Sequence, residues 1–339
     1  MNLGPLFISI DGVILSKNDR KNLNSDYVGG VILFSRNYEN KKQLKELINS
    51  IKDIKSPELI VSVDQEGRRV QRFINDFYRL PSLRTIGKLY DQSHSKGQES
   101  ALLAGQIMSL ELSEVGIDFS FAPVLDIDYG YSKIIGDRSF HSDPNVISKL
   151  ASSYIDGLKS SGMSSIGKHF PGHGGVILDS HTEMPIDDRG MNELINDIKP
   201  YVYLMNKHLD AIMTAHIHYP LIDESITTFS KHWLKTILRQ ELGFNGLIFS
   251  DDLMMKAVNT ELNMDEKINH ALSAGCDFVL VCNMESQMSD LLDDLDLNIN
   301  ESEMSAKINT LRCKSINKGM IKHSFRELTL KLNHLLDSL

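Results

Sequence analysis

Short apolar runs rich in valine, isoleucine and phenylalanine recur along the chain and alternate with longer segments of helical periodicity. Eight runs are clearest: Leu6–Ile10, Gly30–Phe34, Leu59–Asp64, Asp118–Ala122, Ser165–Lys168, Ala211–Ala215, Leu247–Asp251 and Phe278–Cys282. Near-continuous apolar runs of this kind are typical of strands in a parallel sheet that is buried on both faces. Helical patterns lie between them, notably at Lys41–Ile54, Gly97–Val115, Asn145–Ser161 and Lys231–Glu241.

Glycines follow several helical segments shortly before the next strand, at Gly116, Gly162, Gly243 and Gly275. Glycine is favoured there as a C-cap. Eight strands that alternate with helices predict a (β/α)8 barrel of the TIM type, with an open doubly wound sheet as the alternative. The strand count and the length of 339 residues favour the barrel. We predict one domain, with the catalytic barrel in residues 1–297 and a C-terminal helical extension, residues 298–339, packed on it.

The composition is that of an ordinary soluble globular protein, with 41% hydrophobic and 24% charged residues. No stretch approaches the roughly 18 consecutive apolar residues of a membrane span, and the first residues lack the pattern of a signal peptide. The three cysteines have no paired spacing, which indicates free thiols in a reducing compartment. The net charge of −9 argues against a nucleic-acid partner. We expect a cytoplasmic monomer with no membrane partner.

Polar residues at the ends of the predicted strands are the candidates for chemistry, because barrel active sites lie at the carboxyl ends of the strands. Asp64 ends the third run, where its carboxylate suits sugar hydroxyls or a cation, or alternatively caps a turn. Lys168 and His169 end the fifth run. Asp251 and Asp252 follow the seventh, and strand alternation would turn one of them into the pocket as a nucleophile, base or metal ligand. A helix N-cap is the alternative for this pair.

The segment after His169 is rich in glycine and histidine, which suits a loop that moves over a ligand, although a solvated loop is the alternative. Asp179 and His181 stand two residues apart within it. In a turn, this spacing lets the carboxylate bind one ring nitrogen and favour the protonated ring. A general acid/base histidine needs that arrangement near neutral pH.

Two further groups have weaker signals. Arg72 and Arg138, with Lys168, Arg68 and Arg69, would make a basic rim suited to carboxylates, or would be ordinary surface arginines. His216 and His218 form an H-x-H pair whose rings share one face of a strand, as a metal pair does. The alternative for this pair is one histidine that faces a ligand and one that packs. A metal-dependent hydrolase that uses His169, His173, His216, His218 and Asp251 is therefore a rival function.

The motifs resemble the signature of family 3 glycoside hydrolases. They are Lys168-His169-Phe170-Pro171-Gly172-His173-Gly174, Asp179-Ser180-His181 and Ser250-Asp251-Asp252-Leu253-Met254. Residues 29–38, 63–67 and 233–244 also match, so the resemblance covers most of the chain in order and is weakest after Asn298. It implies a TIM-type barrel without a cofactor or metal. Its implied activity removes the non-reducing terminal N-acetylglucosamine from 1,6-anhydro-N-acetylmuramic acid peptides in cell-wall recycling.

The resemblance also implies roles for individual residues. Asp251 would be the nucleophile of a retaining mechanism, and His181, supported by Asp179, would be the acid/base. Sugar binding would fall to five residues: Asp64, Arg72, Arg138, Lys168 and His169. Two departures from the family pattern stand out. Arg68 replaces the second glycine of D-Q-E-G-G-R-V, and residues 175–178 are more apolar than usual. Two more functions rival this one: a broader β-N-acetylhexosaminidase that acts on chitin fragments, and a muropeptide-binding protein.

Overall fold

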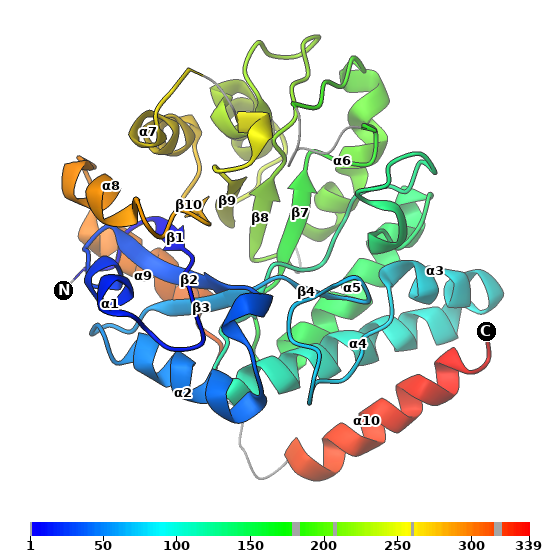
Figure 1. The fold of residues 1–339 in the computed structure, drawn as a ribbon. Coiled ribbons are helices and arrows are strands. Elements are labelled where there is room, and N and C mark those ends of the chain that lie inside the picture. The colour runs from blue at the N-terminus through cyan, green and yellow to red at the C-terminus, as the bar shows by residue number, and fades with distance from the viewer. Residues whose placement is uncertain (1, 178–183, 206–208, 259–260, 315–320) are drawn as a thin grey trace.

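A single sheet of eight parallel strands forms the centre of the molecule (Figure 1). The computed structural model describes residues 2–177, 184–205, 209–258, 261–314 and 321–339. The strands are β1 (Leu6–Ile8), β2 (Val28–Leu33), β3 (Ile60–Val63), β6 (Phe119–Ser120), β7 (Ile166–Phe170), β8 (Ala211–Thr214), β9 (Leu247–Asp252) and β10 (Phe278–Val281). They pair in the order β6-β3-β2-β1-β10-β9-β8-β7. Every strand coincides with one of the apolar runs in the sequence.

The segment that follows β6 closes the sheet into a barrel. Its backbone pairs with β7 through the bonds from Ile166 N to Ala122 O (2.9 Å) and from Leu125 N to Lys168 O (2.7 Å). An isolated parallel bridge joins Val124 to Lys168. The predicted (β/α)8 barrel is therefore confirmed, and the open doubly wound sheet is excluded.

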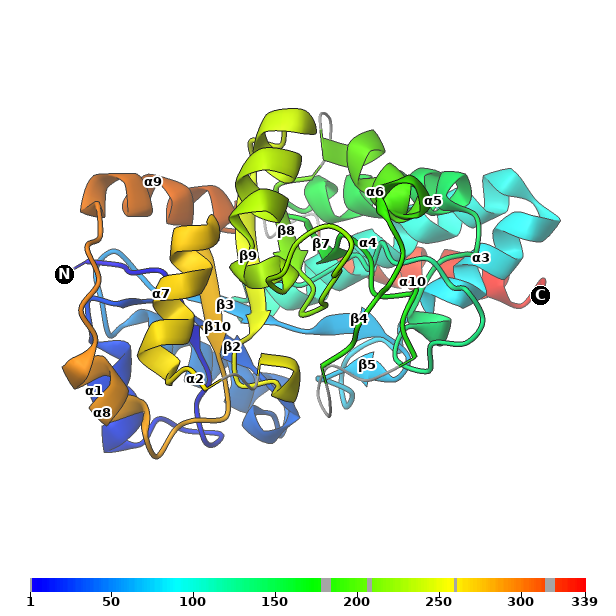
Figure 2. The same ribbon diagram turned by 90° about the horizontal axis from the view of Figure 1, so that it is seen from above.

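Helices surround the barrel and connect its strands (Figures 1 and 2). They are α1 (Lys17–Leu23), α2 (Lys41–Lys52), α3 (Leu83–Gln92), α4 (His94–Val115), α5 (Pro144–Ser160), α6 (Met191–Met205), the π-helix η4 (His232–Glu241), α7 (Met264–Ala274), α8 (Met288–Asp294), α9 (Glu301–Leu311) and α10 (Ile321–Leu336). Short 3₁₀ turns are η1 (Ser35–Asn37), η2 (Gly136–Arg138), η3 (Thr227–Phe229) and η5 (Lys256–Val258). The four helical patterns in the sequence correspond to α2, α4, α5 and η4. Within the described ranges, no helix has the length and apolar character to cross a membrane.

The glycines expected at helix ends all have positive φ, at +99° for Gly116, +75° for Gly162, +72° for Gly243 and +134° for Gly275. Gly116 shows the reason, because its left-handed backbone lets its N–H bond the carbonyls of Leu112 and Ser113 at the end of α4.

Aromatic side chains fill the interior of the barrel. The rings of Phe7 and Phe249 lie 5.2 Å apart, and those of Phe121 and Phe249 lie 5.4 Å apart. Phe7 lies on β1, Phe121 directly follows β6, and neither β1 nor β6 is next to β9 in the sheet, so these rings meet across the interior. All three are fully buried. The barrel is thus a packed core, and a ligand site has to lie at one of its ends.

The C-terminal helices pack on the outside of the barrel. Helix α9 crosses the amino-terminal end of the barrel, on the side away from the hairpin of β4 (Gln65–Gly67) and β5 (Val70–Gln71) (Figure 2). At this end, Lys307 Nζ lies 2.9 Å from Asp277 Oδ1, and the Cys313 N–H donates to Asp118. Helix α10 lies beside α4, and Lys331 pairs with Glu99 there. Neither of these two helices covers the carboxyl ends of the strands. The domain boundary at residue 297 stays a prediction.

Candidate active site

A cavity of ≈ 460 Å³ opens at the carboxyl ends of the strands, where (β/α)8 barrels place their active sites. Of the eight residues to which the family resemblance gives a role, six line it: Asp64, Arg72, Arg138, Lys168, His169 and Asp251. Asp179 and His181 lie outside the described residues. The charges on the described wall balance, with four acidic and four basic side chains: Asp64, Glu66, Asp251, Asp252, Arg69, Arg72, Arg138 and Lys168.

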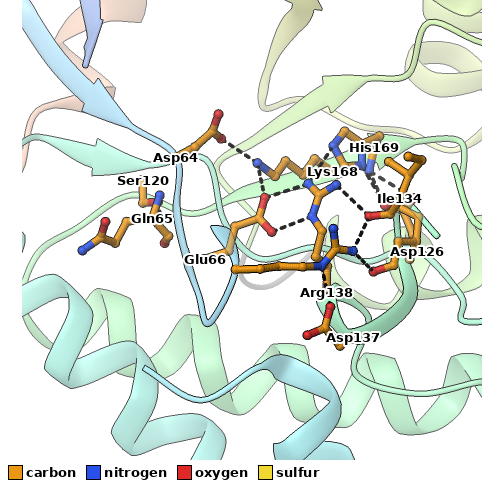
Figure 3. Close-up of polar contacts among 12 residues, drawn as sticks. Asp64, Gln65, Glu66, Ser120, Asp126, Ile134, Asp137, Arg138, Lys168 and His169 are labelled. Carbon is orange, nitrogen blue, oxygen red and sulfur yellow. Dashed lines mark hydrogen bonds and ion pairs between the residues drawn. The ribbon is translucent and has the colours of Figure 1, made fainter. Parts of the chain in front are cut away.

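Lys168 lies at the centre of a buried ion network (Figure 3). Its Nζ is 2.7 Å from Asp64 Oδ1 and 2.7 Å from Glu66 Oε1. Arg138, on η2, binds both carboxylate oxygens of Glu66 at 2.8 Å, through Nε and Nη2. Such a two-point contact fixes the geometry of both partners. Arg72 Nη2 lies 3.6 Å from the second oxygen of Asp64, so Asp64 has a cation near each of its carboxylate oxygens.

Burial and charge act in opposite directions in this network. Burial alone would raise the pKa of Glu66, but Arg138 and Lys168 hold it well below its usual range. Burial alone would lower the pKa of Lys168, but Asp64 and Glu66 outweigh burial and raise it. These groups are therefore ionised at neutral pH. The expectation that Lys168 and Arg138 belong to a basic rim with free charges is therefore wrong. Lys168 is 2% exposed, and both Lys168 and Arg138 pair with the carboxylate of Glu66.

A short hairpin brings Glu66 into the network. Strands β4 (Gln65–Gly67) and β5 (Val70–Gln71) follow β3 directly and pair antiparallel. Arg68 occupies the turn with φ +45°, a backbone conformation that favours glycine. Its side chain is exposed and does not line the cavity. The next residue, Arg69, bonds the carboxylate of Asp137 (2.6 Å) and the carbonyl of Ile134 (2.7 Å), which ties the hairpin to the turn that carries Arg138.

His169 is held by a buried aspartate. Its Nδ1 lies 2.7 Å from Asp126 Oδ2, and Asp126 also accepts the backbone N–H groups of His169 and His173 (Figure 3). Burial opposes ionisation of Asp126, but His169 and His173 outweigh it and hold its pKa below the usual value. An ionised Asp126 accepts a hydrogen bond from a protonated Nδ1, so Nε2 is left as the acceptor and lies 3.5 Å from Arg138 Nη2. The register of β7 against β8 shifts between Lys168 and Phe170, and both Lys168 and His169 line the cavity.

The two aspartates at the end of β9 have different surroundings, although both line the cavity. The Asp252 N–H donates to Asp251 Oδ1 at 2.8 Å. Burial would raise the pKa of Asp251, but His216, His169, this N–H and Lys168 hold it below its usual value. Asp252 Oδ1 accepts the N–H groups of Met254 and Cys282, each at 3.0 Å. Asp252 therefore holds a turn and the neighbouring strand end. The helix N-cap that was the alternative for the pair does not form, since the next helix, η5, begins only at Lys256. Asp251 presents an ionised carboxylate.

The H-x-H pair after β8 does not form the expected site. His216 is fully buried, and its ring contacts Thr228 Oγ1 (2.8 Å) and the carbonyl of Asp252 (3.0 Å). Neither His216 nor His218 lines the cavity, so the alternative with one ligand-facing ring is also wrong. Across the described parts of the chain, no three His, Cys, Asp or Glu residues gather as metal ligands.

Glycines approach other parts of the chain closely where the chain enters the segment that contains Asp179 and His181. A Cβ at Gly174 would lie 1.8 Å from the carbonyl oxygen of Ile127, and one at Gly175 would lie 1.9 Å from Arg189 Nη2. On the far side, the Asp187 N–H bonds the carbonyl of His218 at 2.9 Å. Both flanks of the segment are therefore anchored to the barrel.

Two residues of the site were not among the candidates. Glu66 lies inside the quoted run Val63–Gly67, but nothing in the sequence shows that it joins two cations. Asp126 follows the irregular segment that closes the barrel, four residues beyond the predicted end of the fourth strand at Ala122. An acidic residue soon after a barrel strand was the available signal for both.

Comparison with known proteins gives consistent relatives. Beta-hexosaminidase from Methylobacillus flagellatus is 44% identical over 306 residues, which make up 90% of this chain and 88% of that protein. Beta-hexosaminidase from Thioalkalivibrio sulfidiphilus is 46% identical over 296 residues, covering 87% of this chain and 85% of that protein. The crystal structure of NagZ from Neisseria gonorrhoeae in complex with N-trifluoroacetyl-D-glucosamine has a TM-score of 0.92 and 38% identity, and covers 99% of each chain.

Together, the barrel, its charged cavity and these relatives define a glycoside hydrolase. The model of the glycosyl hydrolase family 3 N-terminal domain matches residues 8–312. The chain belongs to glycoside hydrolase family 3, as its motifs indicate, and it is similar to NagZ within that family.

Proposed function

We propose that the protein is a retaining exo-β-N-acetylglucosaminidase. Its substrates would be peptidoglycan fragments that carry a terminal N-acetylglucosamine on 1,6-anhydro-N-acetylmuramic acid peptides, and its role would be in peptidoglycan recycling. The single observation that carries the proposal is Asp251, an ionised carboxylate in the same cavity as all five proposed sugar-binding residues. The names of the relatives, and the N-acylated glucosamine bound to the Neisseria protein, support the choice of sugar.

In the proposed mechanism, Asp251 attacks the anomeric carbon while the His181 imidazolium gives its proton to the leaving glycosidic oxygen. A glycosyl ester of Asp251 forms and the aglycone departs. Neutral His181 then takes a proton from water, which attacks the same carbon and releases Asp251 and the sugar with net retention. Asp179 would hold His181 in the tautomer that both steps require.

The ion network would bind the sugar before the chemistry. Asp64 offers acceptor oxygens to hydroxyl groups, and Lys168 and Arg138 offer donors on the same side of the cavity. His169 offers Nε2 as an acceptor, because Asp126 holds the proton on Nδ1. Arg72 lines the cavity beside Asp64. Side chains that are already locked by one another need little reorganisation when the sugar arrives.

The test uses a chromogenic N-acetyl-β-glucosaminide with EDTA present throughout. We expect chromophore release by the natural protein, no release by Asp251→Ala, and recovery of Asp251→Ala turnover by azide, with an α-glycosyl azide as product. Asp252→Ala with azide is the matched control and should give no such product. Normal turnover by Asp251→Ala would refute the nucleophile. No release by a folded natural protein would favour a metal-dependent hydrolase or a muropeptide-binding protein.

The aglycone is tested separately. We expect a higher kcat/KM for N-acetylglucosaminyl-1,6-anhydro-N-acetylmuramyl peptide than for chitobiose. Equal values would instead support the broader β-N-acetylhexosaminidase.

We further propose that the enzyme works as a cytoplasmic monomer. Cys276 and Cys282 are buried, unpaired thiols, which is the usual state in a reducing compartment. Native mass spectrometry and cell fractionation test the two statements. A dimer or a periplasmic location would refute the corresponding one.

A further inference from the structure

His216 stands where the main-chain pairing between β8 and β9 has stopped. The ladder between these neighbouring strands (Figure 1) ends at the pair Met213 and Phe249, three residues before the end of β9. Beyond that point, His216 Nε2 reaches across and contacts the carbonyl oxygen of Asp252 at 3.0 Å. A side-chain bond therefore continues the cross-strand contact where no backbone pair exists, immediately beside Asp251.

The other side of the same segment is held by the backbone of β10. Asp252 pairs with Leu280, the Leu253 N–H bonds the carbonyl of Leu280 at 2.9 Å, and the Cys282 N–H bonds Asp252 Oδ1. His216 thus adds a hydrogen bond to this end of β9 from the β8 side.

A chain of buried hydroxyl groups fixes the His216 ring. Thr214, Thr228 and His216 are each 0% exposed. Thr228 Oγ1 lies 2.8 Å from His216 Nδ1, and Thr214 Oγ1 lies 2.8 Å from Thr228 Oγ1. A carbonyl only accepts, so Nε2 carries the proton that it gives to Asp252. Thr228 Oγ1 also lies 3.3 Å from the carbonyl of Ala215, so the hydroxyl that contacts Nδ1 is itself held in place.

We propose that His216, oriented by Thr228 and Thr214, is a positioning residue for Asp251. It touches no substrate, because it does not line the cavity. It fixes the backbone that follows Asp251, and the Asp252 N–H in turn fixes the Asp251 carboxylate. The inference rests on the proposed function in one respect, the role of Asp251 as nucleophile. A nucleophile that is misplaced by about 1 Å loses on the order of a hundredfold in rate.

The kinetic test compares variants of similar shape. We expect His216→Met to lower kcat about 10- to 100-fold with KM within about twofold, because ground-state binding does not use Asp251. His216→Gln keeps an amide donor near Nε2 and should recover most of the loss. Thr228→Val should also have a lower kcat than the natural enzyme, and Thr228→Ser, which keeps the hydroxyl, should have nearly the natural kcat. The matched control is Thr227→Val, a buried neighbour whose hydroxyl bonds Ile217 instead, and it should leave kcat unchanged.

Hydrogen exchange of the folded proteins gives a readout that needs no turnover. We expect the amides of residues 252–254 to exchange at least tenfold faster in His216→Met than in the natural chain, with Thr227→Val unchanged. Unchanged exchange, or equal kcat for His216→Met and the natural enzyme, would overturn the positioning role. If the natural protein were inactive, the proposed function would fail while the exchange comparison would still decide on His216. If His216→Met does not fold, the Thr228→Val and Thr228→Ser pair decides.

Discussion

The guanidinium of Arg138 binds the carboxylate of Glu66 through two parallel bonds of 2.8 Å, and the Glu66 side chain is 3% exposed. Lys168 uses the same carboxylate, so one buried acid organises two of the proposed sugar-binding cations. Removal of that acid would leave both cations with fewer partners in a low-dielectric wall.

Glu66→Gln is therefore expected to lower the free energy of unfolding by about 3–5 kcal/mol, the usual cost of breaking a buried ion pair. It should also raise KM, since Arg138 and Lys168 lose their fixed geometry. Urea unfolding and steady-state kinetics measure the two effects. Asp293→Asn is the control, because its pair with Lys21 is exposed (62% and 58%) and should cost under about 1 kcal/mol. Equal losses for the two variants would contradict the prediction.

The pH dependence of stability has a definite sign. Glu66 and Asp126 have folded pKa values below their ordinary values, so their contribution is complete above the unfolded pKa of about 4 and is lost as the pH falls through the folded values. We expect the free energy of unfolding to fall on acidification below about pH 5. The decline should be shallower in Glu66→Gln, measured by urea unfolding between pH 7 and pH 3.5. A parallel decline in the variant would show that Glu66 does not contribute.

Asp126→Asn tests the orientation of His169. The amide carries no charge and can accept at only one of its two positions, whereas Asp126 accepts the His173 N–H at Oδ1 and faces the His169 ring with Oδ2. An amide oxygen kept at Oδ1 turns the NH2 group toward Nδ1, so His169 should lose its fixed tautomer. We expect kcat/KM to fall about 10- to 100-fold, and the affinity for free N-acetylglucosamine to fall with it. Calorimetric titration measures the affinity. The exposed Asp296→Asn is the control, and unchanged affinity in Asp126→Asn would separate Asp126 from sugar binding.

Arg68→Gly should stabilise the protein by about 1 kcal/mol, because the turn holds Arg68 at φ +45° and a left-handed conformation costs an L-residue about that much. Arg68→Ala keeps the strained backbone and removes the charge, so it should give no gain. Thermal unfolding compares the three proteins. An equal gain in both variants would assign the effect to charge. Activity should be unchanged, since the Arg68 side chain lies off the cavity wall.

Gly174→Ala should impair both folding and turnover, because its Cβ would lie 1.8 Å from the Ile127 carbonyl oxygen and the backbone would have to shift. Gly12→Ala is the matched control, with its nearest atom at 3.9 Å. Melting temperature and kcat are the measurements. If Gly174→Ala behaved like Gly12→Ala, the close approach would not constrain this flank of the segment.

The sequence was most informative about the strands and least informative about which side chains pair within the folded chain. Buried strands leave continuous apolar runs, which is why the barrel could be predicted. Helix α6 was not among the helical patterns named from the sequence, and Pro200, which lies inside it, is a residue that normally interrupts a helix. Lys168 was expected at a basic rim, because composition records its charge but not Asp64, 104 residues away, which accepts its hydrogen bond. Asp126 and His169 are 43 residues apart, and only the closed barrel brings them together.

The balanced charges of the cavity have a consequence for the medium in which the enzyme works. The formal charges of the four acidic and four basic side chains on the described wall cancel, so few counterions have to be displaced when the uncharged N-acetylglucosamine end of the substrate enters. The buried pairs themselves are poorly screened by salt. We therefore expect the affinity for the terminal sugar to be nearly the same in dilute and in concentrated electrolyte.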